Sequence, residues 1–323
     1  MNFATLAITV TLFTIGIIFI VKGGDYFVDA ASWIAEVSGI PKLIIGATVV
    51  SLATTLPEML VSVMAALDGK VDMSIGNAVG SVTANVGLIM GISLVFIPSV
   101  IRRKDYLLKS ILMLTAASIT VLCGLSGSIS LQFCILLLII FTIFIVENVK
   151  GAIQGSKNNH DEPKDPNLKT PNAIRTNIFK FIIGTIGIVV GAQLLVNSGS
   201  DLARLLGISE RIIGVTLVAV GTSLPELITT LTAIRKKQAS LSVGNIIGAN
   251  ILDLTLIMPI ASIITGKALP VASNSAMVDL PACLLVSCVA LIPTLITQKF
   301  AKWQGYLLLI LYGIYVYVTC FAL

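Results

Sequence analysis

Long apolar runs separated by short polar turns dominate the chain. Ten of these runs are long enough to cross a bilayer as an α-helix, which takes about 20 residues. Their approximate limits are 4–35, 43–67, 72–98, 105–126, 129–149, 177–206, 211–234, 240–264, 274–297 and 303–322. The first and sixth runs exceed a perpendicular crossing, so we expect these helices to tilt or to continue along the interface. The pattern predicts an all-α integral membrane protein with ten transmembrane helices.

The one strongly polar interval extends from Asn148 to Arg175. Its asparagine, lysine, proline and aspartate residues offer too little apolar surface to offset the entropy of ordering, so it is interpreted as a solvated linker. We therefore divide the chain into a first five-helix repeat at 1–149, a linker at 150–176 and a second five-helix repeat at 177–323. The single histidine, His160, lies in this linker and is interpreted as a solvent-exposed residue.

The two halves are related in sequence. An offset of 168 residues superimposes 23–90 on 191–258 without a gap. The matches include prolines, glutamates, asparagines and glycines, so shared hydrophobicity does not explain them. Because five helices make an odd number of crossings, the second half enters the membrane in the opposite orientation. Such inverted repeats are typical of secondary transporters, which bind their substrates near the midplane, between the repeats.

Composition and charge narrow the class of protein. Hydrophobic residues make up 56% of the chain and charged residues 11%, and the mean hydropathy of +1.00 excludes an ordinary soluble domain. The formal net charge of +5 comes from basic residues in short loops, so nucleic acid is not an expected partner. These basic residues gather on one side, at 102–104, in the linker, at 235–237 and at 299–302. The bias predicts a cytoplasmic linker and two external termini.

A five-residue motif occurs once in each half, TTLPE at 54–58 and TSLPE at 222–226, inside an apolar run. A carboxylate at membrane depth is costly, and such residues mark ion or substrate pathways. Glu58 and Glu226 are therefore candidate site residues. Their equivalence in the repeat favours one paired site over two separate ones.

Each motif also contains a proline and hydroxyl side chains. Proline lacks an N–H and clashes with the preceding turn, so Pro57 is expected to free the carbonyl of Ala53, and Pro225 is expected to break the second helix in the same way. Carbonyls freed at such breaks can coordinate cations. Thr54 lies four residues before Glu58 and shares its face on a regular helix, and Thr222 stands in the same relation to Glu226.

The following helix of each half carries the pattern Gly-Asn-x-x-Gly, at 76–80 and at 244–248. Small residues four apart allow close helix contact. Asn77 and Asn245 are interpreted either as cross-links between helices or as ion ligands. We expect the second and third helices of the chain, with the seventh and eighth, to form the ion-binding core.

The candidate ligands of this core all offer oxygen. Beyond the glycines lie Ser81 and Asn85 in the first half, and Ala249 and Asp253 at the equivalent positions of the second. Three carboxylates and one amide would then face the same region, with no histidine or cysteine beside them. Hard cations such as calcium prefer such ligands, whereas softer metals do not.

Two other acids, Asp25 and Asp29, lie nearer to the end of the first helix. They have no acidic counterpart in the second half, where Gln193 and Asn197 stand. Lys22 lies one turn from Asp25, so a structural ion pair between these two residues is expected.

The segments 46–91 and 214–259 resemble the two alpha-repeats of the cation/calcium exchanger superfamily, particularly prokaryotic sodium/calcium exchangers. The diagnostic motifs are GTSLPE at 221–226 and GNIIGANILD at 244–253, with their counterparts in the first half. The resemblance implies an antiporter of a prokaryotic plasma membrane that exchanges calcium for sodium by alternating access, with the long first and sixth helices sliding past a fixed bundle. It implies no organic cofactor.

The same resemblance assigns roles to individual residues. Glu58 and Glu226 would be the central carboxylates, assisted by Thr54 and Thr222. Sodium would use these groups together with Thr55, Ser223, Ser81, Asn85, Asp253 and the backbone carbonyls of Ser51 and Ala219. The chain departs from the family pattern at Thr55, which replaces serine and keeps the hydroxyl, at Val82, which replaces asparagine, and at Ala249, which replaces serine. Ala249 removes an oxygen from one peripheral sodium site.

Three other functions compete with sodium/calcium exchange. A proton/calcium antiporter could use the same scaffold, because buried glutamates also carry protons. An intramembrane enzyme would use Glu58 and Glu226 as an acid/base pair, but no nucleophile or metal-binding histidine motif accompanies them. A passive channel would not move calcium against its concentration gradient. The sequence carries no signal for the oligomeric state.

Overall fold

The computed structural model describes residues 3–96, 103–158, 166–206 and 219–322, and this part of the chain is helical apart from one pair of two-residue strands. Within these ranges, nine helical segments are long and apolar enough to cross a membrane. The predicted all-α class is thereby confirmed. The expected seventh span at 211–234 begins outside the described residues, and its described part consists of α10 (Ala219–Thr222) and α11 (Leu224–Arg235).

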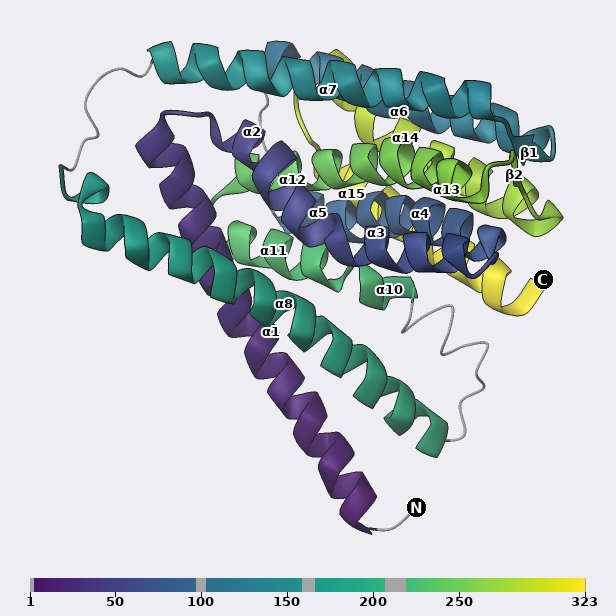
Figure 1. Cartoon of the computed structure of the whole chain (residues 1–323), viewed down its shortest axis with the longest axis horizontal. Helices are drawn as coiled ribbons and strands as arrows, with labels where there is room; N and C mark the ends of the chain where they lie inside the picture. Colours follow the sequence, from purple (N-terminus) through teal and green to yellow (C-terminus); the bar gives the residue numbers. More distant parts are fainter. Residues whose placement is uncertain (1–2, 97–102, 159–165, 207–218, 323) are drawn as a thin grey trace.

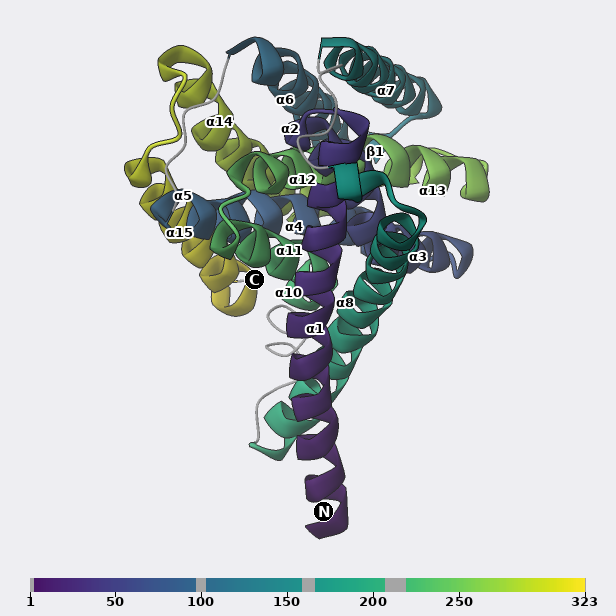
Figure 2. The ribbon, with the colours of Figure 1, turned by 90° about the vertical axis from the view of Figure 1, so that its left-hand side faces the viewer.

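Two long helices, α1 (Phe3–Ser38) and α8 (Pro171–Leu205), lie side by side along one edge of the molecule. Figures 1 and 2 show that both extend beyond the other helices. Glycines bring their backbones together, because a Cβ added at Gly184 would lie 2.6 Å from the backbone nitrogen of Phe27. A Cβ at Gly23 would lie 2.8 Å from the nitrogen of Ile188. Small residues at such crossings allow the contact, and the expected length of both helices is confirmed.

The second and third spans are each interrupted by a π-helical turn. The second consists of α2 (Lys42–Ile45), η1 (Gly46–Val50) and α3 (Ser51–Leu67). The third consists of α4 (Val71–Ala84), η2 (Asn85–Met90) and α5 (Gly91–Phe96). In the second half, α12 (Ala239–Leu252) continues through η5 (Asp253–Ile257) into α13 (Met258–Thr265). Asn85 and Asp253, which are equivalent in the sequence repeat, each begin a π turn, a distortion frequent at functional sites.

The remaining helices complete the bundle. They are α6 (Arg103–Leu125), α7 (Leu131–Asn158), η3 (Pro166–Lys169), η6 (Ser275–Asp279), α14 (Leu280–Thr297), α15 (Lys302–Tyr317) and η7 (Val318–Ala322). α6 packs against α14, and α15 packs against α5. The turns after α6 and α13 are joined by β1 (Ser128–Ile129) and β2 (Leu269–Pro270), which pair antiparallel with Ser128 opposite Pro270. This contact joins the loop between α6 and α7 in the first half to the loop after α13 in the second half.

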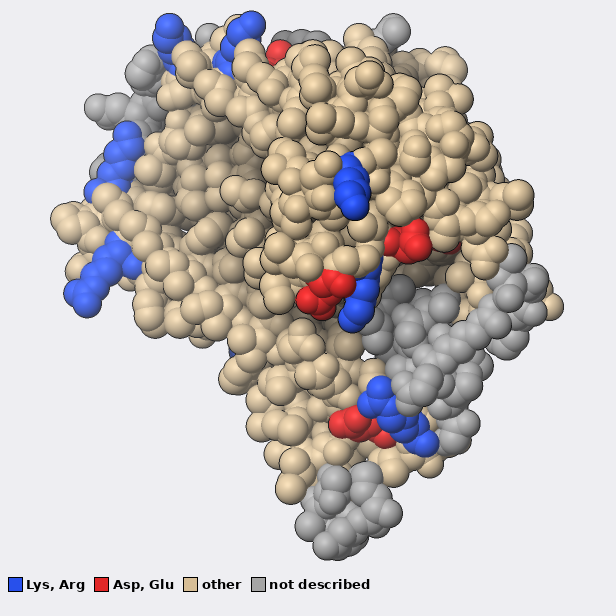
Figure 3. Space-filling view, turned by 45° about the vertical axis from the view of Figure 1, so that its right-hand side comes forward, with Lys and Arg blue, Asp and Glu red and all other residues tan. Residues whose placement is uncertain are grey.

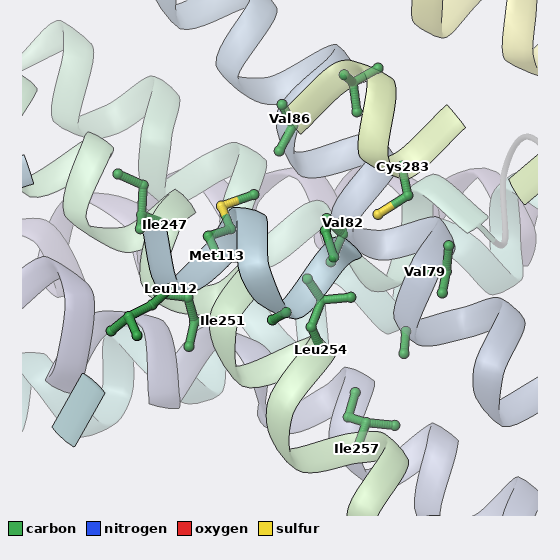
Figure 4. Close-up of a cluster of buried hydrophobic side chains, with 14 of the residues drawn as sticks. Val79, Val82, Val86, Leu112, Met113, Ile247, Ile251, Leu254, Ile257 and Cys283 are labelled. Carbon is green, nitrogen blue, oxygen red and sulfur yellow. The ribbon is translucent and has the colours of Figure 1, made fainter. Parts of the chain in front are cut away.

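Apolar side chains fill the interior and also cover the outside. Figure 4 shows the interior cluster, in which Val82 of α4, Met113 of α6 and Leu254 of η5 meet. On the outside, Leu60 is 62% exposed and Phe179 is 63% exposed, and charged residues are sparse on the face shown in Figure 3. Such broad apolar exposure suits a lipid environment rather than water, which agrees with the predicted membrane protein.

The expected break at Pro57 is absent, whereas a break does occur in the second half. α3 runs through Pro57 as one helix. The helix is continuous although Pro57 has no N–H to donate to the carbonyl of Ala53. In the second half, Ser223 separates α10 from α11, and Pro225 lies in the first turn of α11. A proline there costs no helical hydrogen bond.

Helical structure also extends into the interval that was interpreted as a linker. α7 continues to Asn158 and α8 begins at Pro171. Lysine, glutamine and glutamate are good helix formers, so the polar end of α7 remains helical beyond its apolar stretch. Trp33 of α1 donates from Nε1 to Leu168 O of η3 at 3.1 Å, which fixes the chain just before α8.

Asp25 pairs with α11 rather than with Lys22. Its carboxylate contacts Arg235, and Lys236 Nζ lies 3.6 Å from Asp25 Oδ1 and 2.6 Å from Asp29 Oδ1. Lys236 also donates to the backbone carbonyl of Asp25 at 2.9 Å. These contacts, here called the α1–α11 ion cluster, attach the long helix α1 to the end of the site-bearing helix α11.

Candidate functional site

Three carboxylates from both halves of the chain are buried near one another. Glu58 is on α3, Glu226 on α11 and Asp253 at the start of η5, and each is no more than 1% exposed. Glu58 lies within electrostatic range of both Glu226 and Asp253. Neither oxygen of Glu58 or Asp253, nor Oε2 of Glu226, has a hydrogen-bond partner among the described residues. Unpaired buried acids cost several kcal/mol each, so this arrangement needs a compensating positive charge.

Hydroxyl groups of α3 surround these acids. Thr55 Oγ1 donates to Glu226 Oε1 at 3.3 Å, which joins the first half to the carboxylate of the second. Thr54 Oγ1 lies 3.2 Å from Asn245 Oδ1 and 3.3 Å from the carbonyl oxygen of Ser51. Thr54 and Thr55 therefore both make contacts around the paired glutamates, one to α12 and one to α11.

Most of the other residues predicted for the site are buried. Ser51, Ser81, Asn85 and Ser223 are each at most 2% exposed. Among the described residues, the side chains of Ser81, Asn85 and Ser223 have no hydrogen-bond partner. The η2 segment that begins at Asn85 packs against α11 and α12. Thr222 is half-buried at the end of α10. Ala219 begins α10, but its side chain lies outside the part that the structure describes.

Asn77 and Asn245, which the sequence leaves either as helix cross-links or as ion ligands, both form hydrogen bonds to α3, but through different atoms. Asn77 donates from Nδ2 to Glu58 O at 3.2 Å and to Ser62 Oγ at 2.8 Å. Asn245 instead accepts from Thr54 through Oδ1. The structure therefore favours cross-linking for both residues, although they occupy equivalent repeat positions.

Asn250 is a polar residue that sequence reasoning did not select. It is fully buried on α12, and neither of its amide atoms has a hydrogen-bond partner within the described ranges. It lies three residues before Asp253, on a neighbouring part of the helix surface. Its repeat equivalent is Val82, so an amide in place of an aliphatic side chain was the signal that could have identified it.

The site lies beside a close contact between the two halves. A Cβ added at Gly244 would lie 2.2 Å from Leu43 O, and one at Gly248 would lie 2.6 Å from Ala47 O. Both glycines of α12 thus permit contact with α2 and η1. Nothing described lies within 4 Å of a Cβ at Gly76 or Gly80, whose counterpart surface at 211–218 is outside the described residues.

A crevice too narrow to admit a water molecule lies between this core and the α1 and α8 pair. Phe27, Thr185 and Ile188 line it from α1 and α8, and Thr54 and Pro225 line it from the core. The long helices therefore cover one side of the candidate site, and a shift of these helices would change access to Thr54.

The ligand set is not a preformed metal centre of acids alone. Among the described residues, no three histidines, cysteines or acids come together closely enough to hold a metal ion by themselves. A cation at Glu58 and Glu226 would also need hydroxyl, amide or carbonyl oxygens. Calcium accepts six to eight such ligands of mixed type, and weak neutral ligands suit an ion that must be released.

Comparison with known proteins identifies the family of the chain. The family model described as sodium/calcium exchanger protein matches residues 8–149 and 176–321. An uncharacterized membrane protein of Methanocaldococcus jannaschii is 36% identical over 316 residues, covering 95% of this chain and 96% of that protein. The sodium/calcium exchanger MaX1 of Methanosarcina acetivorans is 30% identical over 332 residues, covering 92% and 94%.

A solved structure of the sodium-calcium exchanger NCX_Mj, soaked with Na⁺ and Sr²⁺, has a similar fold. The TM-score is 0.79 at 32% sequence identity, and the match covers 96% of this chain and 98% of that one. The matches extend over both halves and all the site-bearing helices. The chain therefore belongs to the sodium/calcium exchanger family and, within the cation/calcium exchanger superfamily, is of the prokaryotic type.

Proposed function

We propose that this protein is a secondary antiporter that exchanges calcium for sodium at one shared site between its two halves. Glu58 and Glu226 are the central ligands, and Asp253 adds a third carboxylate. Oxygens from both repeats complete the site, namely those of Thr54, Thr55, Thr222, Ser223, Ser81 and Asn85 and the backbone carbonyls of Ser51 and Ala219. Membership of a transporter family excludes the intramembrane enzyme.

The observation that carries the proposal is the burial of unpartnered carboxylate oxygens from both halves. Glu58 and Asp253 expose almost no surface, and all four of their carboxylate oxygens lack partners among the described residues. The three carboxylates carry at most three negative charges, which one calcium ion offsets in large part and three sodium ions offset fully, whereas calcium together with several sodium ions would exceed them. The two ions therefore compete, and competition at a shared site couples their movements.

The proposal includes alternating access, which the separate packing of the long helices supports. The long helices α1 and α8 pack mainly on each other and line a narrow crevice beside Thr54. In the proposed cycle this pair slides past the core and opens the site to one side at a time. The empty site changes sides slowly, because moving uncompensated buried carboxylates is costly. This property prevents leakage of either gradient.

The proposed orientation of the chain in the membrane rests on the distribution of lysine and arginine residues among its loops. The second half is inverted relative to the first, the linker is cytoplasmic, and both termini are outside. Arg235 and Lys236, at the end of α11, then lie on the cytoplasmic side. The division into repeats at 1–149 and 177–323 remains part of this proposal.

Proton-driven calcium transport on the same scaffold is the second candidate, because the three buried acids can also bind protons. The deciding experiment is radiocalcium uptake into proteoliposomes with an imposed sodium gradient, or with an imposed pH gradient and no sodium. We expect uptake driven by sodium and abolished when the sodium gradient is collapsed. Uptake driven by pH alone would instead support the proton antiporter, and uptake that never exceeds equilibrium would indicate a channel.

A further inference from the structure

Asn77 and Asn245 occupy equivalent positions of the two halves but form different bonds. Asn77 donates its amide hydrogens within its own half, to Glu58 O and Ser62 Oγ. Asn245 reaches across the halves, and its Oδ1 lies 3.2 Å from Thr54 Oγ1. Of these two asparagines, only Asn245 therefore accepts a hydrogen bond from a hydroxyl of the candidate site.

The chemistry of Thr54 explains why an acceptor matters at this place. A hydroxyl has one hydrogen to donate and two lone pairs, and a cation can bind only to the lone pairs. The hydrogen of Thr54 has three acceptors within reach: Asn245 Oδ1 at 3.2 Å, Ser51 O at 3.3 Å and the carboxylate of Glu226. The carbonyl of Ser51 is itself a proposed sodium ligand, so a hydrogen directed to it would compete with the ion.

We propose that Asn245 is a positioning residue for cation binding. Its side-chain carbonyl takes the Thr54 hydrogen, which turns the lone pairs of Thr54 toward the ion and leaves the carbonyl of Ser51 free to bind as well. One amide of the second half thus prepares two oxygens of the first. This inference rests on the proposed function, because it assumes that Thr54 binds the transported ions.

The packing around Asn245 supports a fixed geometry. Asn245 is fully buried on α12, one residue after Gly244, where the helix approaches Leu43 O so closely that a Cβ would lie 2.2 Å away. Thr54 is also buried, at 2% exposed. Removal of the amide would leave the hydrogen of Thr54 only acceptors that are themselves proposed ion ligands, the carbonyl of Ser51 and the carboxylate of Glu226.

A double-mutant cycle tests this inference. Asn245→Ala, Thr54→Val and the double variant are reconstituted, and the calcium concentration for half-maximal sodium-driven uptake is measured. We expect each single variant to raise this concentration about fivefold, the effect of one neutral hydrogen bond. The double variant should be no worse than Thr54→Val alone, because the amide acts only through the hydroxyl.

Asn77→Ala is the matched control, since it removes the equivalent amide without touching Thr54. Its effect should add to that of Thr54→Val. A merely structural role of Asn245 would lower the amount of folded protein or the maximal rate without such coupling. If Asn245→Ala acts additively with Thr54→Val, or leaves the half-maximal concentration unchanged, the positioning role is wrong.

Asn245→Asp provides a second measurement if the alanine variant does not fold. It keeps the acceptor, so Thr54→Val should weaken calcium binding as much in this background as in the wild type. Loss of the Thr54→Val effect there would contradict the inference. If Thr54→Val has no effect in the wild type, the proposed ion site itself is wrong at Thr54, which distinguishes the two failures.

Discussion

At the scale of single residues, the three buried acids dominate the chemistry of the protein. Glu58, Glu226 and Asp253 come from three separate elements and are buried, and among the described residues none of them forms an ion pair with a basic side chain. Such groups destabilise the fold unless a cation is bound. Function and stability therefore make opposite demands on the same carboxylates.

Replacing Glu58 or Glu226 with glutamine separates the contribution of each carboxylate to ion binding from its cost to the stability of the fold. We expect sodium-driven calcium uptake to fall by about tenfold or more, because a charged ligand is lost that is worth at least about 1.4 kcal/mol. Without ions, the variants should unfold at the same temperature as the wild type or higher, since a buried charge is removed. Calcium should stabilise the wild type but not the variants.

Radiocalcium uptake and thermal unfolding in detergent, with and without calcium, check this expectation. Asp68→Asn is a suitable control, because Asp68 is an exposed acid at the end of α3 that contacts only Lys70. Wild-type uptake by both glutamine variants would refute the assignment of the central ligands.

At the scale of helices, the halves touch through glycines of α12. A methyl group at Gly244 would lie 2.2 Å from Leu43 O and 3.0 Å from Ala47 N, so Gly244→Ala must separate α12 from α2 and η1. We expect a loss of about 1–3 kcal/mol, seen as a lower unfolding temperature, together with weaker calcium binding because the halves share the site.

Gly313→Ala is the corresponding control in α15. Nothing described lies within 4 Å of a Cβ at Gly313, and alanine is a better helix former by about 1 kcal/mol. This variant should be as stable as the wild type or more stable. If the two substitutions lower the unfolding temperature equally, close packing at Gly244 is not the cause.

The halves also differ in how their long helices are attached. α1 is bound to α11 through the α1–α11 ion cluster of Asp25, Asp29, Arg235 and Lys236. In α8 the equivalent residues Gln193 and Asn197 bond to each other at 2.9 Å. The cluster therefore stabilises contact at one end of the molecule without a symmetric counterpart.

Removing the ion pairs that Lys236 forms with Asp25 and Asp29 should loosen α1. In Asp29→Asn combined with Lys236→Gln, we expect amide hydrogens near the end of α1 to exchange faster, by about fivefold at most, because partly exposed pairs contribute only about 0–1 kcal/mol. High salt should produce a similar change in the wild type. Asp201→Asn, which loses a pair with Arg204 inside α8, should leave exchange in α1 unchanged. Unchanged exchange in the double variant would show that the ion pairs of Lys236 do not hold α1.

At the scale of the whole molecule, the proposed inverted arrangement predicts which side of the membrane each loop faces. Lys157 at the end of α7 should face the cytoplasm, and Lys267 after α13 should face outward, because the basic loops gather on the linker side. Both residues are exposed, so single cysteines placed there are accessible to a membrane-impermeant thiol reagent.

Labelling of whole cells is the measurement. We expect Lys267→Cys to react in intact cells and Lys157→Cys to react only after the membrane is opened. The unsubstituted protein serves as the background control, since its five cysteines lie in apolar segments and four of them are buried. Labelling in the reverse order would invert the proposed topology.

Much of the protein could be predicted from local pattern. The apolar runs, their lengths and the long first and sixth helices follow from hydropathy, because a bilayer imposes the same requirement on every crossing segment. The repeated motif likewise identified Glu58 and Glu226 as a pair. The behaviour of the two prolines is not contained in this local pattern: the ring of Pro57 predicts a break, but α3 continues through it, whereas the equivalent helix is interrupted at Ser223.

The sequence by itself determined the membrane class, the two related halves and the oxygen-bearing residues of the site. These properties are encoded in composition and in short periodic patterns. Only the tertiary structure decided that Asn245 turns to Thr54 while Asn77 turns to Glu58, and that Asp25 pairs with α11 instead of Lys22. Asn245 and Thr54 are 191 residues apart, and equivalent positions in a repeat have different neighbours once the halves pack. The choice between possible partners is made by packing, which local sequence does not contain.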